Sequence, residues 1–343
     1  MINLISDTVT KPNPAMIEAM MHAEVGDDVF KADPSVNKLQ STLAQMFEMD
    51  AGLFCPSGTM TNQIAIKMHT NPMDELICEK LSHVYKYENG GYAYNSGIAL
   101  KLIEGKHGKI MPEQLDDIVN PDYDWLPTSK LVCIENSCNA GGGSYYTLDE
   151  IQAISKKTKE LGLLLHLDGA RLFNVLAETN ESTSAIGKCF DSISICFSKG
   201  LGAPVGSILL GKEKFIKKAR KIRKAMGGGM RQAGYLASAC QYAVENNVQR
   251  LKTDNDRAKE LGIVLADCSF VKKVIPVHTN ILIFDLRDDL YSEGFLQKLT
   301  EKGILASAFG PQKIRFVTHL DISEDNMLEV KKVLKQMSYE YIN

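Results

Sequence analysis

Two short segments of this chain end in side chains that can do chemistry, an acid in the first and an amine in the second. Residues 163–171 read LLLHLDGAR, and residues 192–200 read SISICFSKG. Each is a run of apolar or β-branched residues, which predicts a buried strand. Open α/β sheets bind their ligands at the carboxyl ends of the strands, where these two runs deliver Asp168, Arg171 and Lys199. The pattern therefore predicts a site that holds an acid and an amine.

An acid and a lysine presented in this way suit pyridoxal phosphate (PLP). The carboxylate of Asp168 would keep the pyridine nitrogen protonated, and the amine of Lys199 would form the Schiff base. The same two residues also fit a buried ion pair, or two unrelated strand ends. On these segments alone, all of these interpretations stay open.

The segment CPSGTMTNQ at 55–63 ends a predicted strand, turns on Gly58 and enters a predicted helix. Free N–H groups and the helix dipole make a helix start a phosphate site. Ser57, Gly58 and Thr59 are the candidate phosphate ligands. An ordinary helix cap at Ser57 or Thr59 explains the same letters.

Arginine binds a planar carboxylate through two parallel hydrogen bonds, and an amino-acid substrate needs such a clamp. Arg171 follows Asp168 by one helical turn, and Arg315 lies in KIRFVTH at 313–319. For Arg315, a surface ion pair fits the sequence equally well.

His83, in LSHVYKYENGG, is the histidine with the most promising neighbours, Tyr87 among them. It would stack on a cofactor ring, act as a base, or be a partly buried helix residue. His166 alternates with Asp168 and points to the same side of its strand. Because no third ligand is visible beside this pair, no metal site is predicted.

Composition narrows the class of protein. The chain has 343 residues, of which 44% are hydrophobic and 24% are charged, and its net charge is −3. This balance gives no electrostatic support to a nucleic-acid partner. No apolar segment approaches the roughly 18 residues of a membrane span, and MINLISDTVT has no signal-peptide character. Eight cysteines without metal spacing indicate reduced thiols, so we expect a cytoplasmic protein.

Apolar runs alternate with amphipathic stretches from about residue 50 to 245, which predicts an α/β fold with a mostly parallel sheet. We expect two domains, a large one at 1–248 and a small C-terminal α+β domain at 249–343. The expected strands of the large domain are 51–55, 74–79, 130–136, 163–168, 190–196 and 205–210. The expected helices are 31–50, 59–69, 112–119, 147–161, 170–177 and 212–225, followed by a long helical region at 229–267.

With these segments in view, the chain resembles the threonine aldolases, which are PLP-dependent enzymes of fold-type I (the aspartate aminotransferase-like fold). The resemblance runs essentially end to end, and its motifs occur in the family's order. The lysine motif and GGGMRQ are specific, whereas PSGT is less so. The matching segments are SDTVTKP at 6–12, EVGDDVF at 24–30, PSGTMTNQ at 56–63, HLDGAR at 166–171, FSKGLGAPVGS at 197–207, GGGMRQAG at 227–234 and IRFVTH at 314–319.

The resemblance implies a role for each candidate residue. Lys199 would carry the internal aldimine, Asp168 would pair with the pyridine nitrogen, and His83 would stack over the ring. Gly58 and Thr59 would take the phosphate. The expected substrate contacts are Ser6, Arg171, Arg315, Tyr87 and Trp125. Arg231 would reach the phosphate region of a neighbouring subunit, so a homodimer or homotetramer is expected.

Two positions depart from the family pattern. Family members often have histidine where Trp125 stands, and that histidine is associated with the β-hydroxyl of the substrate. They also commonly read ENTHN where this chain reads ENSCN, which places Cys138 at a histidine position. Either change bears on the accepted β-substituent and on the preference between threonine epimers.

The reaction that the resemblance implies is cleavage of the Cα–Cβ bond of L-threonine, L-allo-threonine or related β-hydroxy-α-amino acids, which gives glycine and an aldehyde. An alternative that keeps PLP is a β-eliminating lyase or an aminotransferase, because one fold hosts several chemistries. A non-catalytic phosphate- or nucleotide-binding protein would explain PSGT, but it leaves Asp168, Lys199 and the arginines without a role. A cofactor-free Schiff-base aldolase would need neither the phosphate turn nor the acid.

Overall fold

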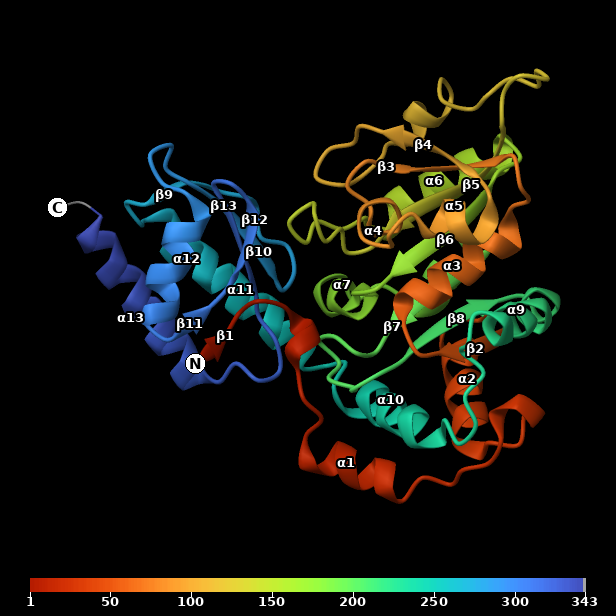
Figure 1. Ribbon diagram of the computed structural model, residues 1–343, viewed down its shortest axis with the longest axis horizontal. Helices are drawn as coiled ribbons and strands as arrows, with labels where there is room; N and C mark the ends of the chain where they lie inside the picture. Colours follow the sequence, from red (N-terminus) through yellow and green to blue (C-terminus); the bar gives the residue numbers. More distant parts are fainter. Residues whose placement is uncertain (342–343) are drawn as a thin grey trace.

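A seven-stranded sheet forms the centre of the chain in the computed structural model, which describes residues 1–341 (Figure 1). Five neighbouring strands are parallel, and β8 alone runs opposite to the strands on either side of it. This mostly parallel sheet confirms the predicted fold class. In spatial order the strands are β2 (Ala51–Cys55), β8 (Ser207–Gly211), β7 (Ser192–Cys196), β6 (Leu164–Gly169), β5 (Thr128–Glu135), β3 (Asp74–Glu79) and β4 (Ala99–Ile103).

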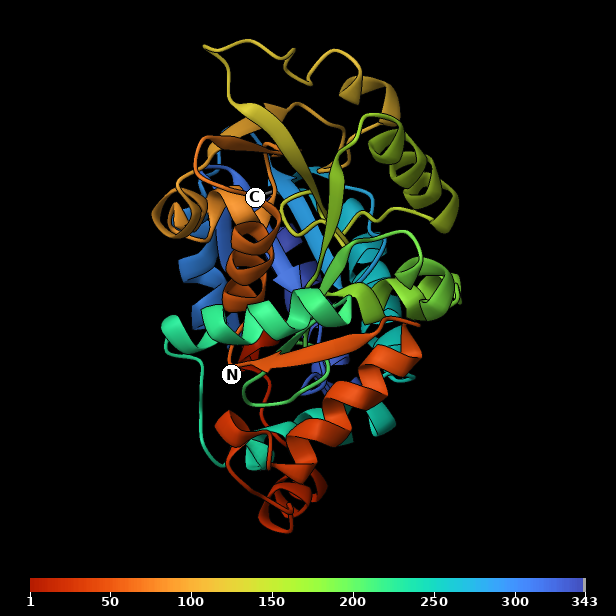
Figure 2. The ribbon, with the colours of Figure 1, turned by 90° about the vertical axis from the view of Figure 1, so that its right-hand side faces the viewer.

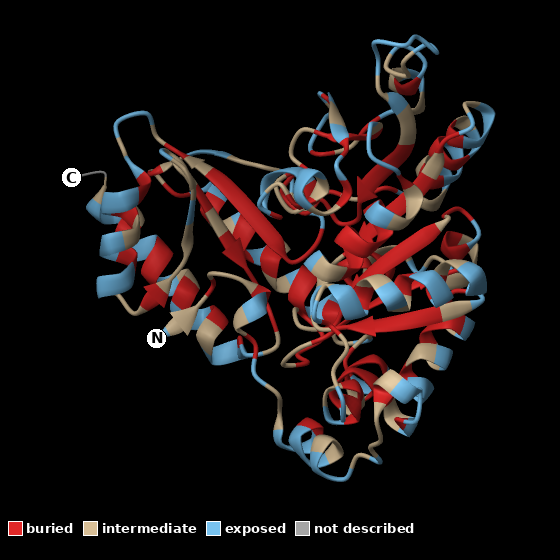
Figure 3. Cartoon of the chain, turned by 45° about the vertical axis from the view of Figure 1, so that its right-hand side comes forward, coloured by how far each residue is buried: buried red, intermediate tan, exposed pale blue. Residues whose placement is uncertain are grey.

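Helices cover both faces of this sheet, because its strands are apolar on both sides. Phe54 and Ile208 face the main core, whereas their chain neighbours Leu53 and Leu209 face a second cluster with α3 and α9. Both α2 and α9 lie against β2 (Figure 2). In Figure 3 the strands are buried and the outer helix faces are exposed. The principal helices are α2 (Pro34–Met46), α3 (Gly58–His69), α6 (Leu148–Glu160), α7 (Leu172–Thr179), α9 (Glu213–Ala225) and α10 (Gly234–Asn246).

Short helices and helical turns connect the principal elements of the larger part. Among them, α4 and α5 follow β3 and carry His83 and the residues after it. The helical turns η1 and η2 belong to the N-terminal segment. These elements are η1 (Asp7–Val9), α1 (Pro14–Met21), η2 (Asp28–Phe30), α4 (His83–Lys86), α5 (Gly91–Ser96), η3 (Pro112–Leu115) and α8 (Thr183–Gly187).

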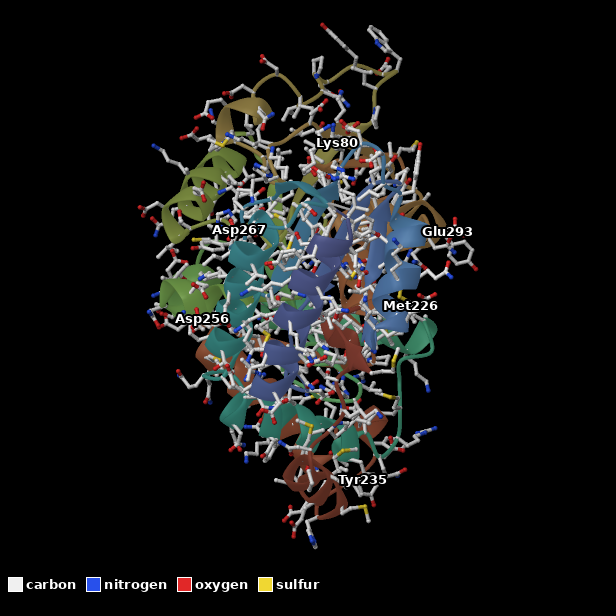
Figure 4. The ribbon with its side chains drawn as sticks, turned by 90° about the vertical axis from the view of Figure 1, so that its left-hand side faces the viewer. Lys80, Met226, Tyr235, Asp256, Asp267 and Glu293 are labelled. Atoms are coloured by element: carbon white, nitrogen blue, oxygen red, sulfur yellow. The ribbon has the colours of Figure 1, made fainter. Side chains whose placement is uncertain are left out.

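A second, antiparallel sheet lies in the C-terminal part, in the order β12-β13-β10-β9. Its apolar side packs on α11 and α13, which lie side by side in Figure 4, where Asp256 and Asp267 mark α11. The elements are α11 (Leu251–Ala266), β9 (Val271–Val274), β10 (Ile281–Leu286), α12 (Ser292–Glu301), β11 (Ile304–Leu305), β12 (Ser307–Gly310), β13 (Lys313–Val317) and α13 (Glu324–Glu340).

The N-terminus joins this C-terminal part. The strand β1 (Ile2–Asn3) pairs in parallel with β11, and Leu4 is buried in the C-terminal core. The chain then crosses to the large sheet, where α1 packs on α10. The domain division at residue 248 stays a prediction, and residues 2–4 lie with the smaller part.

The structure departs from the expected elements in several places. The segment 112–119 is helical only over η3, and the region 229–267 consists of two helices, α10 and α11. They are separated near Asn247, whose side chain donates to the carbonyl of Leu201 at 2.7 Å. The strand β4 was not predicted, because it is an edge strand with mixed exposure and its letters ALKLI lack a strong alternation. Within residues 1–341, no helix has the length and apolarity of a membrane span.

Gly169 makes the close contact between β6 and β7 beside Asp168. A Cβ atom added there would lie 2.6 Å from the carbonyl oxygen of Ser194, so one strand would have to move. We expect Gly169→Ala to lower the free energy of unfolding by about 1–3 kcal/mol. Gly294→Ala is the matched control, since a Cβ in that helix meets no atom within 4 Å. It should raise stability by up to about 1 kcal/mol. Thermal unfolding of both variants checks this, and equal melting temperatures would contradict it.

Candidate active site

The carboxyl ends of β5, β6 and β7 bring the candidate residues together. Glu135 at the end of β5 is in register with Asp168 of β6, and Asp168 is in register with Ser194 of β7. Thr61 of α3 contacts Ser194 through a 2.6 Å hydroxyl–hydroxyl hydrogen bond. The start of α3 is thereby held over the same edge, where an open α/β sheet places its ligand.

Asp168 is buried, with an exposed fraction of 3%, and only part of its hydrogen-bonding capacity is used. Its Oδ2 accepts a hydrogen bond from Asn62 Nδ2 at 2.9 Å, and its Oδ1 accepts one from the N–H of Ala170 at 3.2 Å. A carboxylate has about four lone-pair directions, so it retains room for a further donor. Asp168 can therefore bind an N–H group of a ligand.

His83 begins the short helix α4 and lies beside Asp168. Its Nδ1 is 3.0 Å from Oε1 of the buried Glu88, and its backbone N–H donates to Oε2 of Glu135 at 3.1 Å. Burial lowers the pKa of His83, but the hydrogen bond to Glu88 and the charges of Asp168, Glu88 and Glu135 outweigh it, so the pKa is raised. His83 is thus an imidazole whose proton affinity three carboxylates increase.

His83, Glu88 and Asp168 place one nitrogen and two carboxylate oxygens within 4.8 Å of one another. The amide of Asn62 donates to both carboxylates, at 2.8 Å to Glu88 and 2.9 Å to Asp168. His166 lies behind this amide, with Nε2 3.1 Å from Asn62 Oδ1, and not in the trio. The third group near Asp168 is therefore Glu88, which the sequence did not indicate.

Glu135 is a second carboxyl group at the base of the site. Burial and the charge of Asp168 raise the pKa of Glu135 to about 7, although hydrogen bonds from the N–H groups of Asn139 and His83 and the charge of His83 oppose the shift. Its Oε1 accepts from the N–H of Asn139 at 3.0 Å. Glu135 therefore ties His83 to the loop after β5 and can gain or lose a proton near neutral pH.

Arg171 is buried against Asp7 of the N-terminal segment. Its Nε donates to Asp7 Oδ2 at 2.8 Å and its Nη2 to Oδ1 at 2.7 Å, a two-pronged ion pair. Burial raises the pKa of Asp7, but Arg171, Lys199 and a hydrogen bond from Asn280 lower it well below its ordinary value. The edge of Arg171 that would grip a substrate carboxylate is therefore already occupied by Asp7.

Lys199 follows β7, and its positive charge helps to lower the pKa of Asp7. Its backbone carbonyl accepts hydrogen bonds from Thr10 Oγ1 at 3.0 Å and from the N–H of Gly202 at 2.8 Å. Over residues 1–341, its ammonium group makes no hydrogen bond and no ion pair. The backbone around Lys199 is thus held firmly, and its amine is free to react.

Arg315 of β13 faces the same site, and no carboxylate of the described residues pairs with it. Its Nη1 donates to Asn139 Oδ1 at 2.9 Å and its Nη2 to the carbonyl of Ile5 at 3.1 Å, while its Nε is buried without a partner. Burial and the charge of Arg171 lower the pKa of Arg315 to about 10, although Asp7 and Tyr87 oppose the shift. A guanidinium in this state is suited to bind an anion.

Tyr87 and Ser6 lie beside these groups. The Tyr87 ring is 5.5 Å from that of His83, and burial raises its phenol pKa. Ser6 directly follows Ile5, and its hydroxyl accepts hydrogen bonds from the backbone and side chain of Thr8. Both residues are therefore near the groups that would contact a substrate.

The start of α3 has the features of an anion site. Ser57 caps the helix, with its hydroxyl accepting from the N–H of Met60 at 3.2 Å. Among the hydrogen bonds of residues 1–341, none is donated by the N–H of Gly58 or Thr59. The buried hydroxyl of Ser207 also has no partner, and it lies 3.6 Å from where a Cβ of Gly58 would be. Ser57 thus caps the helix, as the simpler interpretation of PSGT expected. The N–H groups of Gly58 and Thr59 remain available to bind a phosphate.

Trp125 and Arg231 are not gathered with these residues in the single chain. Trp125 is 77% exposed and stacks on Tyr123 with ring centroids 4.8 Å apart. Arg231 is exposed and pairs with Asp27 at 2.7 Å. Cys138 is buried, and its thiol donates to the carbonyls of Glu135 and Gly108. The cysteine at this family histidine position therefore packs in the interior.

Known proteins resemble this chain over most of its length. Residues 3–289 match the family model described as beta-eliminating lyase. The chain belongs to the beta-eliminating lyase family. A low specificity L-threonine aldolase of Escherichia coli is 38% identical over 333 residues, which cover 96% of this chain and 97% of the relative. Low-specificity L-threonine aldolase 1 of Arabidopsis thaliana is 36% identical, over 95% of this chain and 93% of the relative.

The fold of this family member also matches a solved structure. The threonine aldolase of Leishmania major superposes with a TM-score of 0.85 at 22% identity, covering 98% of this chain and all of that chain. The fold-type I architecture expected from the sequence is thereby confirmed, while the role of each residue stays a proposal.

Sequence reasoning missed Asn62, Glu88, Glu135 and Asp7. For Glu135 a signal existed: LVCIE at 131–135 is an apolar run that ends in an acid, as LLLHLD does at 163–168. Asn62, one turn beyond Gly58, also stood inside the PSGTMTNQ segment. Glu88 and Asp7 gave no such signal, because their partners lie on distant elements.

The buried Asp7–Arg171 pair predicts a dependence of stability on pH. The pKa of Asp7 is lower in the folded chain than its unfolded value near 4, so the pair contributes fully above about pH 4 and its contribution is lost as the pH falls through the folded pKa. We expect Asp7→Asn to lose about 3–5 kcal/mol at pH 7, since Arg171 is left buried without a counter-charge.

Urea unfolding at pH 7 and at pH 3 checks this, and the gap between wild type and Asp7→Asn should narrow at the lower pH. Asp289→Asn is the control, because its pair with Arg287 is exposed and should leave the unfolding curve nearly unchanged. A D7N variant as stable as the wild type at pH 7 would show that the pair does not anchor the N-terminal segment.

Proposed function

We propose that this protein is a PLP-dependent aldolase that cleaves L-threonine, L-allo-threonine or related β-hydroxy-α-amino acids into glycine and an aldehyde. The observation that carries the proposal is the arrangement at the ends of β5–β7. Asp168 is buried, and His83 is bound to the carboxylate of Glu88. Lys199 follows the neighbouring strand β7, and within the described chain its amine makes no ion pair. Relatives named low-specificity threonine aldolase, at 36–38% identity, support the same reaction.

The residues present fit PLP. The phosphate would bind the unused N–H groups of Gly58 and Thr59, with Ser57 and the unpartnered Ser207 hydroxyl beside them. Asp168 has room for the pyridine N–H, and Asn62 on the same helix holds it. When bound, the cofactor supplies a covalent link to the substrate amine and a ring that withdraws electrons from Cα. Lys199 would hold the cofactor covalently between substrates.

We assign the substrate carboxylate chiefly to Arg315. Its bonds to Asn139 and Ile5 are to neutral oxygens, and its buried Nε has no partner. Arg171, whose Nε and Nη2 are bound by Asp7, would contribute positive charge and hold the N-terminal segment that carries Ser6. Fixing the carboxylate orients the Cα–Cβ bond for cleavage, and such orientation supplies much of the rate.

His83 is the proposed acceptor of the β-hydroxyl proton. Its imidazole lies among Glu88, Asp168 and Glu135, which raise its pKa. Loss of the hydroxyl proton accompanies release of the aldehyde, and Cα then takes up a proton to give glycine. Tyr87, beside His83, is proposed to line the space for the β-substituent.

The proposed assembly is a homodimer or homotetramer. In this assembly, the exposed Arg231 beside Gly227–Gly229 would reach the phosphate region of a neighbouring subunit, and the exposed Trp125 would contact substrate. All eight cysteines are free and buried, as in a reducing compartment, so we propose a cytoplasmic location.

A second candidate reaction is β-elimination, which the family's description favours. It uses the same groups for the amine, the carboxylate and the ring nitrogen. Its products from serine or threonine would be a 2-oxo acid and ammonia. The products of a single incubation therefore separate the two reactions.

We expect L-threonine and L-allo-threonine, incubated separately with the PLP-loaded protein, to give acetaldehyde and glycine in equal amounts. Lys199→Ala should abolish both products and the borohydride-trappable yellow chromophore. Lys188→Ala, a change in an exposed ion pair with Glu48, should keep both. An oxo acid and ammonia as main products would overturn the aldolase assignment, and a persistent trapped chromophore in K199A would overturn the role of Lys199.

Arg315→Lys should raise the KM for threonine by about 10- to 100-fold, because lysine cannot make the two-pronged bond to a carboxylate. The spectrum of bound PLP should not change, since Arg315 is assigned to the substrate. Arg287→Lys, in the exposed pair with Asp289, is the control and should leave KM unchanged. An unaltered KM in R315K would move the carboxylate site elsewhere.

A further inference from the structure

Glu88 is a buried carboxylate that the mechanism above does not use directly. Its side chain has no exposure, and it accepts three hydrogen bonds. Asn62 Nδ2 and His83 Nδ1 approach Oε1, at 2.8 Å and 3.0 Å, and Gln63 Nε2 donates to Oε2 at 2.6 Å. An oxygen surrounded by amide donors acts as an acceptor, so the hydrogen of the His83 pair lies on Nδ1.

The remaining ring nitrogen of His83 is therefore the one that faces the site. Over residues 1–341, Nε2 of His83 makes no hydrogen bond. The side chain keeps a 28% exposed fraction, so it is accessible from the site. A neutral imidazole with its hydrogen on Nδ1 presents the Nε2 lone pair, which is the form that accepts a proton.

The two carboxylates set the orientation of the Asn62 amide. Nδ2 must face Glu88 and Asp168, so Oδ1 faces His166, whose Nε2 lies 3.1 Å away. Burial lowers the pKa of His166 to about 4, against the charge of Asp168 and a hydrogen bond to the Ser192 backbone. The Nδ1 of His166 lies 2.8 Å from the Ser192 hydroxyl and 3.1 Å from the Ser192 carbonyl oxygen.

The chain of hydrogen bonds continues to His69, whose Nε2 lies 2.8 Å from the Ser192 hydroxyl. Burial lowers the pKa of His69 to about 3, and His166 adds to the shift. A flipped Asn62 amide would turn its oxygen toward the carboxylates of Glu88 and Asp168, so these two acceptors hold Nδ2 in place.

We propose that Glu88, locked in place by Asn62 and Gln63, is the positioning residue that fixes His83 in the tautomer with a free Nε2. This inference rests on the proposed function, in which His83 Nε2 takes the β-hydroxyl proton. Glu88 does not touch the substrate and acts through His83. Asn62 joins the pair to Asp168, so the base and the acid of the site share one amide.

The charged and titratable groups that face His83 come from three elements. Glu88 lies on the segment between α4 and α5, Glu135 on β5 and Asp168 on β6, and Tyr87 lies beside the ring. Among residues 1–341, only Glu88 is hydrogen-bonded to the ring. Glu88→Gln removes this charge and keeps the shape of the side chain, so it should lower the pKa of His83 and allow both tautomers of the ring.

The test is NMR of the PLP-loaded protein with ¹⁵N-labelled histidine, using His83→Asn to assign the His83 signals. In the wild type, the neutral form of His83 should carry its hydrogen on Nδ1. In Glu88→Gln, the pKa of His83 should fall and the tautomers should mix. Glu88→Asp, which keeps the charge, should restore the raised pKa at least in part. Glu18→Gln, from the exposed pair with His22, is the control and should not affect His83.

The lower pKa of His83 in Glu88→Gln also predicts a change in the pH dependence of the rate. A base works when unprotonated, so a lower pKa of His83 moves the acid limb of kcat/KM in E88Q to lower pH. The plateau of kcat should drop by about 10- to 100-fold, within the range that a positioned base contributes. The KM for threonine and the absorbance of bound PLP should change little, because Arg315 and Asp168 keep their contacts.

An Nε2-bonded hydrogen on neutral His83 in the wild type, or an unchanged pKa in E88Q, would overturn the proposal. Should E88Q fail to fold, Asn62→Ala serves in its place, because it removes the second donor to Glu88 and should also mix the tautomers. The NMR result does not depend on the reaction. A correct tautomer without aldolase activity would therefore refute the proposed function and leave the positioning role intact.

Discussion

Three carboxyl groups crowd the carboxyl edge of the large sheet, and the rest of the site depends on how their repulsion is relieved. Glu88, Glu135 and Asp168 are all 5% exposed or less. The amide of Asn62 bridges two of them, and His83 contacts two through its ring and its backbone. Buried charges of one sign require such shared donors or a proton, and the raised pKa of Glu135 shows the second solution.

The N-terminal segment connects this acidic edge to the basic side of the site. Asp7 accepts hydrogen bonds from Arg171 and from Asn280, which follows β9 in the smaller part of the chain. Thr10 binds the backbone of Lys199, and the carbonyl of Ile5 binds Arg315. A few residues thus join the large sheet, the small sheet and the reactive lysine. Asp7 neutralises the charge of Arg171, whereas Arg315 is bound only to neutral oxygens of the described residues and is left for a ligand.

The sequence was informative where local pattern decides structure. Apolar runs marked β5, β6 and β7 within two residues at each end, and the punctuation at Ser57–Gly58 marked the start of α3. It was weak where tertiary contacts decide. The strand β4 forms because an edge position accepts a mixed pattern, and the break between α10 and α11 depends on Asn247 reaching Leu201.

The partners of Arg171 and His83 were hidden for the same reason, since Asp7 is 164 positions from Arg171 and Glu88 follows a turn. Trp125 and Arg231 are on the surface of the single chain, and a sequence motif does not show which residues of another subunit would contact them.

Asp168 is proposed to hold the ring nitrogen of bound pyridoxal phosphate in its protonated state. The direct measurement is the ¹⁵N chemical shift of the pyridine nitrogen in protein reconstituted with ¹⁵N-labelled pyridoxal phosphate. We expect a protonated nitrogen in the wild type and an unprotonated one in Asp168→Asn. An unprotonated nitrogen in the wild type, or a protein that takes up no cofactor, would contradict it.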